Sequence, residues 1–431
     1  MILALCLFVA VLVATALEWT HILLAALLGA AAMLLFGLLT PLQAAESLSS
    51  GAGTIALLFG MMLVVRALEA SGAFHGLAHR LVELSGGQGR SLLLGMVFIT
   101  VPIAALLPNP SAVLLMAPLL PPMARELGLD FRPLLILMVL TANSASLLTL
   151  VGDPALYIVG TGIHWDFLHY GRQVGPAALL VLLALLPTLP WLYRPIWRAK
   201  LPVARITPPP AHHRAALPWL LLVALLMLLF FILGSALPVP LDPAAVALGG
   251  AALTLFISHH SGLKPVDELL ASIDWATLLY FAAVFVLVGG LERSGALDAL
   301  ALQIAHRVGH SLLASSLWLL VVSAALSALI PNIPLVVALT PLLLVACQHN
   351  GLLQDNGVPV QAALPLFEAL MLGVVIGGSA TLIGSSSNLV AAGVARQQGA
   401  RLGFRSWLAY GLPTVAWQLT LASCWCWFNS R

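Results

Sequence analysis

The chain has 431 residues, of which 61% are hydrophobic and only 8% are charged. Soluble domains carry about 25% charged residues, so this composition excludes a soluble globular protein. We expect a polytopic membrane protein of the all-α class, with the lipid bilayer as its surroundings. The net charge of +2 points to no nucleic-acid partner. The four cysteines have no metal-ligand spacing with His, so neither a metal nor a cofactor is predicted.

The first half, residues 1–192, has five apolar runs of membrane-span character, at 2–17, 20–40, 52–68, 133–162 and 174–192. The first run lacks the basic segment of a signal peptide, and the second follows it directly. We therefore predict that it is a transmembrane helix. Between the third and fourth runs we predict an amphipathic stretch and a re-entrant hairpin at 91–124, which turns at Pro108-Asn109.

A basic, Pro-rich segment, 193–215, separates this half from the second half, residues 216–431. The second half again has five runs, at 216–236, 242–258, 271–290, 364–395 and 407–428, and a predicted hairpin at 312–347 with Pro331-Asn332 at its tip. We interpret 193–215 as a linker. Trp residues near both of its ends suit the membrane–water interface.

The two halves are an internal repeat. LLPNPSAVLLMAP at 106–118 returns as LIPNIPLVVALTP at 329–341, an offset of 223 residues. The same offset carries Leu68-Glu69-x-Ser71-Gly72-Ala73 onto Leu291-Glu292-x-Ser294-Gly295-Ala296. Repeated units of this kind, each interrupted by polar residues, are typical of secondary transporters.

Charge predicts the topology. Five spans per half, an odd number, make the repeat inverted, so the two tips enter from opposite sides. If the linker is cytoplasmic and both termini lie outside, all Lys and Arg residues except four fall on the cytoplasmic side of the plasma membrane, as the positive-inside rule requires. The four on the outer side are Arg172, Arg293, Arg307 and Arg431.

Each half also has a polar break inside an apolar run, SASLLTLVGDPAL at 144–156 and GGSATLIGSSSNL at 377–389. Backbone groups freed at such breaks can bind ions or substrate. The predicted substrate- and ion-binding residues are those of the tips and breaks: Asn109, Ser111, Ser144, Ser146, Thr149, Gly152, Asp153, Asn332, Gly377, Gly378, Ser379, Thr381, Gly384, Ser385, Ser386, Ser387 and Asn388. Singly, Ser or Gly in a membrane helix indicates only close helix packing.

Asp153 is the only carboxylate in either break, and its counterpart in the second half is Ser385. A buried carboxylate in a membrane segment is a proton carrier or cation ligand by default. The alternative is that it caps the half-helix that follows.

The motifs resemble a known family. GVVIGGSATLIGSSSNLVAAGVARQQG at 373–399 and TLVGDPALYIVG at 149–160 are similar to signatures of the ion transporter superfamily, in its arsenite-efflux, sodium/proton-antiporter and melanosomal P protein branch, which has a citrate transporter-like domain. More distantly, the layout resembles sodium-coupled dicarboxylate and sulfate symporters. The chain departs from the nearer relatives in having Pro before both tip asparagines and Leu156 where they have Asn.

The resemblance implies an elevator-type carrier in which hairpins and broken helices move against a scaffold, and it suggests a homodimer. We expect a secondary active transporter of a small anion or oxyanion, of the arsenite, sulfate or carboxylate class, with Na⁺ or H⁺ as coupling ion. A sodium/proton antiporter is the alternative. A channel would need a continuous polar pore, and an enzyme would need a catalytic set; the sequence shows neither.

Overall fold

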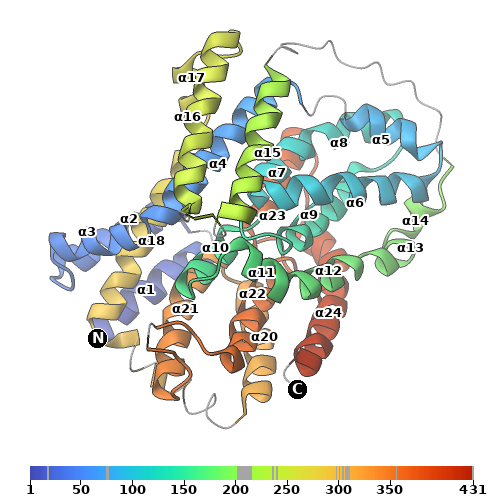
Figure 1. Ribbon diagram of the computed structural model, residues 1–431. Helices are drawn as coiled ribbons and strands as arrows, with labels where there is room; N and C mark the ends of the chain where they lie inside the picture. The colour runs from blue at the N-terminus through green and yellow to red at the C-terminus, as the bar shows by residue number, and fades with distance from the viewer. Residues whose placement is uncertain are drawn as a thin grey trace.

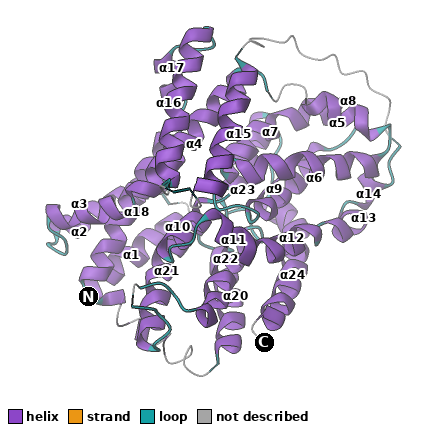
Figure 2. Cartoon of the chain, viewed as in Figure 1, coloured by secondary structure: helices purple, strands orange, loops and turns teal. Residues whose placement is uncertain are grey.

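The computed structural model describes residues 1–16, 19–73, 77–200, 216–234, 237–238, 241–297, 299, 301–302, 305, 311–355 and 357–429. These residues form helices and loops, with two isolated β-bridges and no strand among them, as Figures 1 and 2 show. Seven of the helical segments are long and apolar enough to cross a membrane, and five more are apolar but shorter. The predicted all-α, polytopic class is therefore confirmed.

Every apolar run predicted in the first half contains at least one helix. The elements are α1 (Ile2–Ala16), α2 (Ile22–Leu35), α3 (Pro41–Ser50), α4 (Ala52–Ala70), α5 (Leu77–Ser85), α6 (Gly89–Leu106), α7 (Asn109–Met116), η1 (Ala117–Leu119), α8 (Leu120–Glu126), α9 (Phe131–Ser146), α10 (Pro154–Gly162), α11 (Phe167–Gln173), α12 (Gly175–Leu183), η2 (Leu186–Thr188), α13 (Leu189–Leu192) and α14 (Arg194–Trp197).

The second half follows the same order. Its elements are α15 (Leu217–Leu233), α16 (Pro243–Ser261), α17 (Val266–Ala271), α18 (Trp275–Arg293), α20 (Leu312–Ser327), α21 (Asn332–His349), η4 (Gln361–Ala363), α22 (Leu364–Gly378), α23 (Ser386–Gln397) and α24 (Phe404–Asn429). Residues 201–215, which make up most of the linker, lie outside the described residues, as do residues 298, 300, 303–304 and 306–310 between α18 and α20.

Proline places both hairpin turns. Pro108 and Pro331 have extended backbone angles, with ψ of 133° and 146°, and the next helix begins at the following asparagine in each half. A residue before a helix that cannot donate a backbone N–H suits such a start, because the first amides of a helix have no intrahelical partner. The tips therefore place Asn109 and Asn332, both buried, at the beginnings of α7 and α21.

The two long apolar runs, 133–162 and 364–395, are broken helices. Residues 147–153 separate α9 from α10, and residues 379–385 separate α22 from α23. The break thus falls at the same place in both halves, 232 residues apart.

Around these breaks, helices of one half pack against helices of the other half. The second part of the first broken helix, α10, packs against α21 of the other hairpin, and α23 packs against α7. Away from the hairpins, α4 packs on α16 and α2 packs on α18. In Figure 1 the hairpin of α6 to α8 extends to the right and that of α20 and α21 extends downward, with α10 and α23 between them. Each repeat thus completes the other's core.

Candidate substrate and ion site

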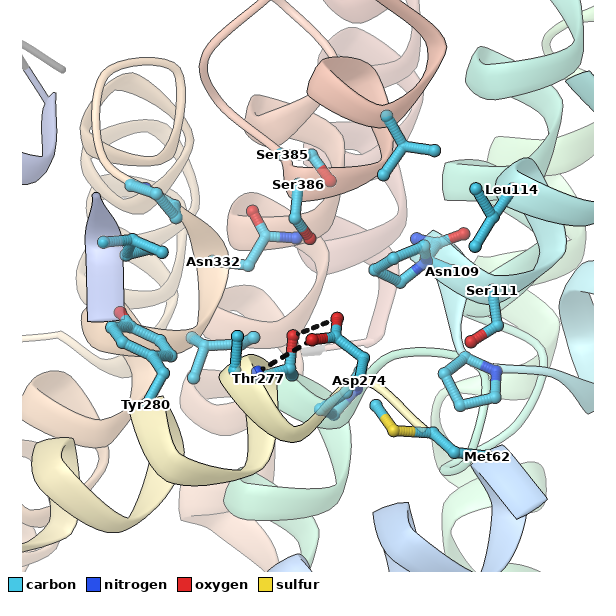
Figure 3. Close-up of a pocket in the computed structure, with 18 of the residues that line it drawn as sticks. Met62, Asn109, Ser111, Leu114, Asp274, Thr277, Tyr280, Asn332, Ser385 and Ser386 are labelled. Atoms are coloured by element: carbon cyan, nitrogen blue, oxygen red, sulfur yellow. Dashed lines mark hydrogen bonds between the residues drawn. The ribbon is translucent and has the colours of Figure 1, made fainter. Parts of the chain in front are cut away.

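A cavity of about 240 Å³ lies where the tips and the broken helices meet. Figure 3 shows Asn109 and Ser111 on one wall and Asn332, Ser385 and Ser386 on another. Asp153 also lines it. Six of the predicted site residues are therefore brought together here, from both halves of the chain.

Four helices start at this cavity, namely α7, α10, α21 and α23. The first backbone N–H groups of a helix lack intrahelical partners and carry partial positive charge, so they attract anions. No side chain caps α7, α21 or α23. In α10, by contrast, Asp153 accepts a hydrogen bond at Oδ1 from Ala155 N over 2.9 Å. The first amide of α7 also has a partner, because Asn109 N donates to the carbonyl oxygen of Gly152 over 3.0 Å. The ends of α10 and α7 are thus already satisfied, and those of α21 and α23 are open.

The tip asparagines have different partners. Asn109 donates from Nδ2 to Ser146 Oγ over 3.2 Å, and its buried Oδ1 has no hydrogen-bond partner among the described residues. Asn332 accepts at Oδ1 from Ser327 Oγ over 2.8 Å and donates from Nδ2 to Asp153 Oδ2 over 3.1 Å. The bond between Asn332 and Asp153 joins the hairpin tip of the second half to the break of the first half, and residues of both halves line one cavity.

Thr149 and Thr381 hold the breaks to the hairpins by matching hydrogen bonds. Each threonine hydroxyl donates to a hairpin carbonyl oxygen, that of Ala105 in the first half and of Ala328 in the second. Each also accepts from a break amide over 3.1 Å, from Gly152 N and from Gly384 N respectively. These residues do not line the cavity. They fix the shape of the loops that do.

The glycines of the breaks allow close backbone approach. A Cβ on Gly152 would lie 2.6 Å from the carbonyl oxygen of Ser146, and one on Gly384 would lie 2.7 Å from that of Gly378. A Cβ on Gly377 would lie 2.2 Å from the carbonyl oxygen of Ala324. These contacts correspond to packing, as expected for small residues in membrane helices.

A buried amide network lies behind the cavity. Asn143 donates from Nδ2 to Ser379 Oγ over 3.0 Å and to Asn388 Oδ1 over 3.1 Å, and it accepts at Oδ1 from Ser387 Oγ over 2.8 Å. Asn388 in turn donates to the carbonyl oxygens of Gly378 and Thr381, each over 2.8 Å. Ser379, Ser387 and Asn388 thus connect the second broken helix to α9 rather than face the cavity.

Ser144 also lies away from the cavity, where it accepts a hydrogen bond from Gln418 Nε2 over 2.8 Å. Asn143 was missed by sequence reasoning. The available signal was a polar side chain inside an apolar run, directly before Ser144.

The opposite wall of the cavity was also missed. It comes from the start of α2, the end of α4 and the start of α18, with His21, Arg66 and Asp274. His21 and Asp274 cap their helices, since they accept from Leu23 N over 3.3 Å and from Thr277 N over 3.1 Å. Charges at span ends indicated only interfacial positions in the sequence.

Across the described residues, no group of three or more His, Cys, Asp or Glu side chains is placed to hold a metal ion. The donors at the cavity are amides, hydroxyls and helix N-termini, and these can bind an anion reversibly. Asp153 and the open Oδ1 of Asn109 are oxygen acceptors that suit a proton or a hard cation.

Comparison with known proteins identifies the family. A family model described as a citrate transporter matches residues 11–366. The chain belongs to the citrate transporter family. Its family membership makes it a multi-pass membrane transporter that acts on a small substrate. The predicted resemblance to the ion transporter superfamily is confirmed.

The relatives of this citrate transporter family member cover nearly its whole length. An uncharacterized transporter of Synechocystis is 40% identical over 425 residues, covering 96% of this chain and 94% of that protein. The P protein of Mus musculus is 28% identical over 454 residues, covering 86% of this chain and 53% of that protein.

Among solved structures, the YdaH transporter of Alcanivorax borkumensis, described as having an unusual topology, is similar in fold. The TM-score is 0.57 with 17% sequence identity, and the match covers 89% of this chain and 86% of that chain.

Proposed function

We propose that the chain is an ion-coupled secondary carrier of a small anion or oxyanion. The observation that carries this proposal is the pair of helix N-termini, of α21 and α23, that open into the cavity without a side-chain cap. Ser111, Ser385 and Ser386 add hydroxyl donors beside them. The cavity is somewhat smaller than the roughly 300–1,000 Å³ of drug-sized ligand pockets, which favours a small substrate.

Asp153 supplies the coupling in this proposal. Its Oδ1 accepts from the α10 backbone, whereas its Oδ2 accepts from the Asn332 amide of the other half. Gain of a proton, or of Na⁺ shared with Asn109 Oδ1, would change the partner that Asn332 meets. Binding of a proton or Na⁺ at the carboxylate would therefore alter the contacts of the hairpin tip beside the substrate.

Alternating access would follow an elevator motion. The tips and breaks exchange contacts with one another, and the cavity separates them from the ends of α2, α4 and α18. We propose that the hairpins and broken helices move as one body past those scaffold helices, and that the scaffold forms a homodimer.

A sodium/proton antiporter is the second candidate, and the position of Asp153 on the cavity favours it. In that case the helix N-termini that open into the cavity would bind no anionic substrate.

Flux in proteoliposomes separates the two. Purified protein is reconstituted and uptake of radiolabelled citrate, succinate, sulfate and arsenite is followed, with and without a Na⁺ or proton gradient. Gradient-driven, saturable uptake with counterflow is expected for one of these substrates. Na⁺-dependent proton movement without uptake of any of them would establish the antiporter and contradict the anion carrier.

A further inference from the structure

We infer that Arg66 binds a second negative group of the substrate, so that the site selects dianions over monoanions. This inference rests on the proposed anion carrier and assigns its charge selectivity to one residue. Arg66 lies near the C-terminal end of α4 and lines the same cavity as Asn332, Ser385 and Ser386. The substrate would thus be held between the open helix N-termini and the guanidinium.

Arg66 is the only Lys or Arg among the described residues that line the cavity. Its side chain is one-quarter exposed, and its ion pair runs to Glu69, one turn along the same helix, with Nη1 2.9 Å from Oε2. Glu69 does not line the cavity, and its side chain is 44% exposed. A guanidinium has five N–H donors in a fixed fork, so this bond leaves donors for a carboxylate in the cavity.

The carboxylates of the cavity do not occupy those donors. Asp153 accepts from Ala155 N and Asn332 Nδ2, and Asp274 accepts from Thr277 at both N and Oγ1. Neither is joined to Arg66 by an ion pair in the described residues.

The internal repeat shows that the fold does not require this charge. The position equivalent to Arg66 in the second half is Gly289, at the same offset of 223 residues. A Cβ on Gly289 would lie 1.9 Å from Ser47 Oγ, so the packing of α3 leaves no room for a side chain at this position. The two halves share the surrounding Leu-Glu-x-Ser-Gly-Ala motif but differ in this side chain. The arginine therefore belongs to one face of the cavity and not to the architecture of the repeat.

Without substrate, Glu69 is the ion-pair partner of Arg66. Exposed ion pairs within a helix contribute little to stability, because water screens both charges. A substrate carboxylate inside the cavity is less hydrated and can meet the guanidinium through two parallel hydrogen bonds. The arriving dianion competes with Glu69 for the guanidinium charge and weakens that pair. A monoanion bound at the helix N-termini leaves the Arg66–Glu69 pair unchanged.

The test compares succinate with acetate on the full-length detergent-purified protein, by thermal-shift titration at constant ionic strength and pH 7. For the unmodified protein, the apparent Kd for succinate is expected to be at least about tenfold below that for acetate. Arg66→Gln should bring the two values together by weakening succinate alone, and Arg66→Lys should restore part of the preference. Glu69→Gln should tighten succinate several-fold and leave acetate unchanged.

Arg90→Gln is the matched control, because Arg90 is exposed at the start of α6, bonds Gln88 and does not line the cavity. It should behave as the unmodified protein. A succinate preference that survives Arg66→Gln, or an equal loss of both ligands, would overturn the role of Arg66 while the anion site stands. If the unmodified protein binds neither succinate nor acetate, this inference fails, while the proposed function is decided separately by the flux of citrate, sulfate and arsenite.

Discussion

At the scale of single residues, the exchange of Asp153 for Ser385 between the halves makes the site asymmetric. Asp153 neutralises the start of α10 with its own carboxylate, whereas the Ser385 hydroxyl pairs with Ser387 Oγ over 2.8 Å and leaves the start of α23 uncapped. A helix N-terminus favours whichever anion is at hand. The protein thus supplies the anion at one equivalent position and leaves the other open.

Removal of the Asp153 charge tests coupling separately from binding. Asn is as good an N-cap as Asp, so Asp153→Asn should keep α10 intact. We expect substrate counterflow to persist and gradient-driven accumulation to disappear, measured in proteoliposomes. Asp166→Asn is the control, since Asp166 caps α11 by accepting from His169 N over 2.6 Å and does not line the cavity. Accumulation that survives Asp153→Asn would leave Asp153 with the role of a helix cap.

Asn388 was predicted to bind substrate, and its contacts indicate a different outcome on mutation. Asn388→Leu leaves the carbonyl oxygens of Gly378 and Thr381 without their side-chain donor, in a fully buried place. A buried polar group without a partner costs about 1–3 kcal/mol. We expect Asn388→Leu to lower the melting temperature in detergent. Asn332→Leu should abolish transport with a smaller change in melting temperature, and the reverse ranking would contradict these assignments.

At the scale of elements, the broken helices depend on glycine where backbone meets backbone. In Gly384→Ala, the new Cβ would lie 2.7 Å from the carbonyl oxygens of both Gly378 and Ser327, so the break must shift away from the hairpin. Overpacking of this kind costs about 1–3 kcal/mol. We expect a lower melting temperature and loss of transport.

Gly393 gives a matched control for that variant, because it lies in α23 with no atom within 4 Å of its would-be Cβ. Gly393→Ala should be neutral or stabilising by up to about 1 kcal/mol, since alanine is the better helix former. A Gly384→Ala protein as stable and active as Gly393→Ala would show that the break tolerates displacement.

At the scale of the whole molecule, the inverted arrangement of the halves stays a prediction that chemical labelling can test. The exposed ends of the hairpins carry Arg90 at the start of α6 and His349 at the end of α21. In a background where Cys6, Cys347, Cys424 and Cys426 are replaced by serine or alanine, Arg90→Cys and His349→Cys should react with a membrane-impermeant maleimide from opposite faces of oriented vesicles.

The same experiment tests the predicted orientation. Arg90 should react from the cytoplasmic face, which holds the basic linker, and His349 from the outer face. Labelling of both from one face would contradict the inversion.

The sequence alone determined the helical class, the membrane setting, the repeat and the positions of the tips and breaks. These features depend on local properties: apolar length, proline before the tip asparagines, and glycine with serine inside apolar runs. For the same reason it identified Asn109, Asp153, Asn332, Ser385 and Ser386, since residues at breaks are recognisable without knowing their neighbours.

The tertiary structure decided which of those residues meet. The bonds from Asn332 to Asp153 and from Asn143 to Asn388 join positions 179 and 245 residues apart, and no local pattern encodes such pairings. The structure also separated residues that face the cavity from those, such as Thr149 and Asn388, that hold its loops from behind. Arg66 and Asp274 enter the site only because α4 and α18 end beside it. A charge at the end of a span has the same sequence appearance whether it faces water or substrate, so only the packing of the two halves distinguishes them.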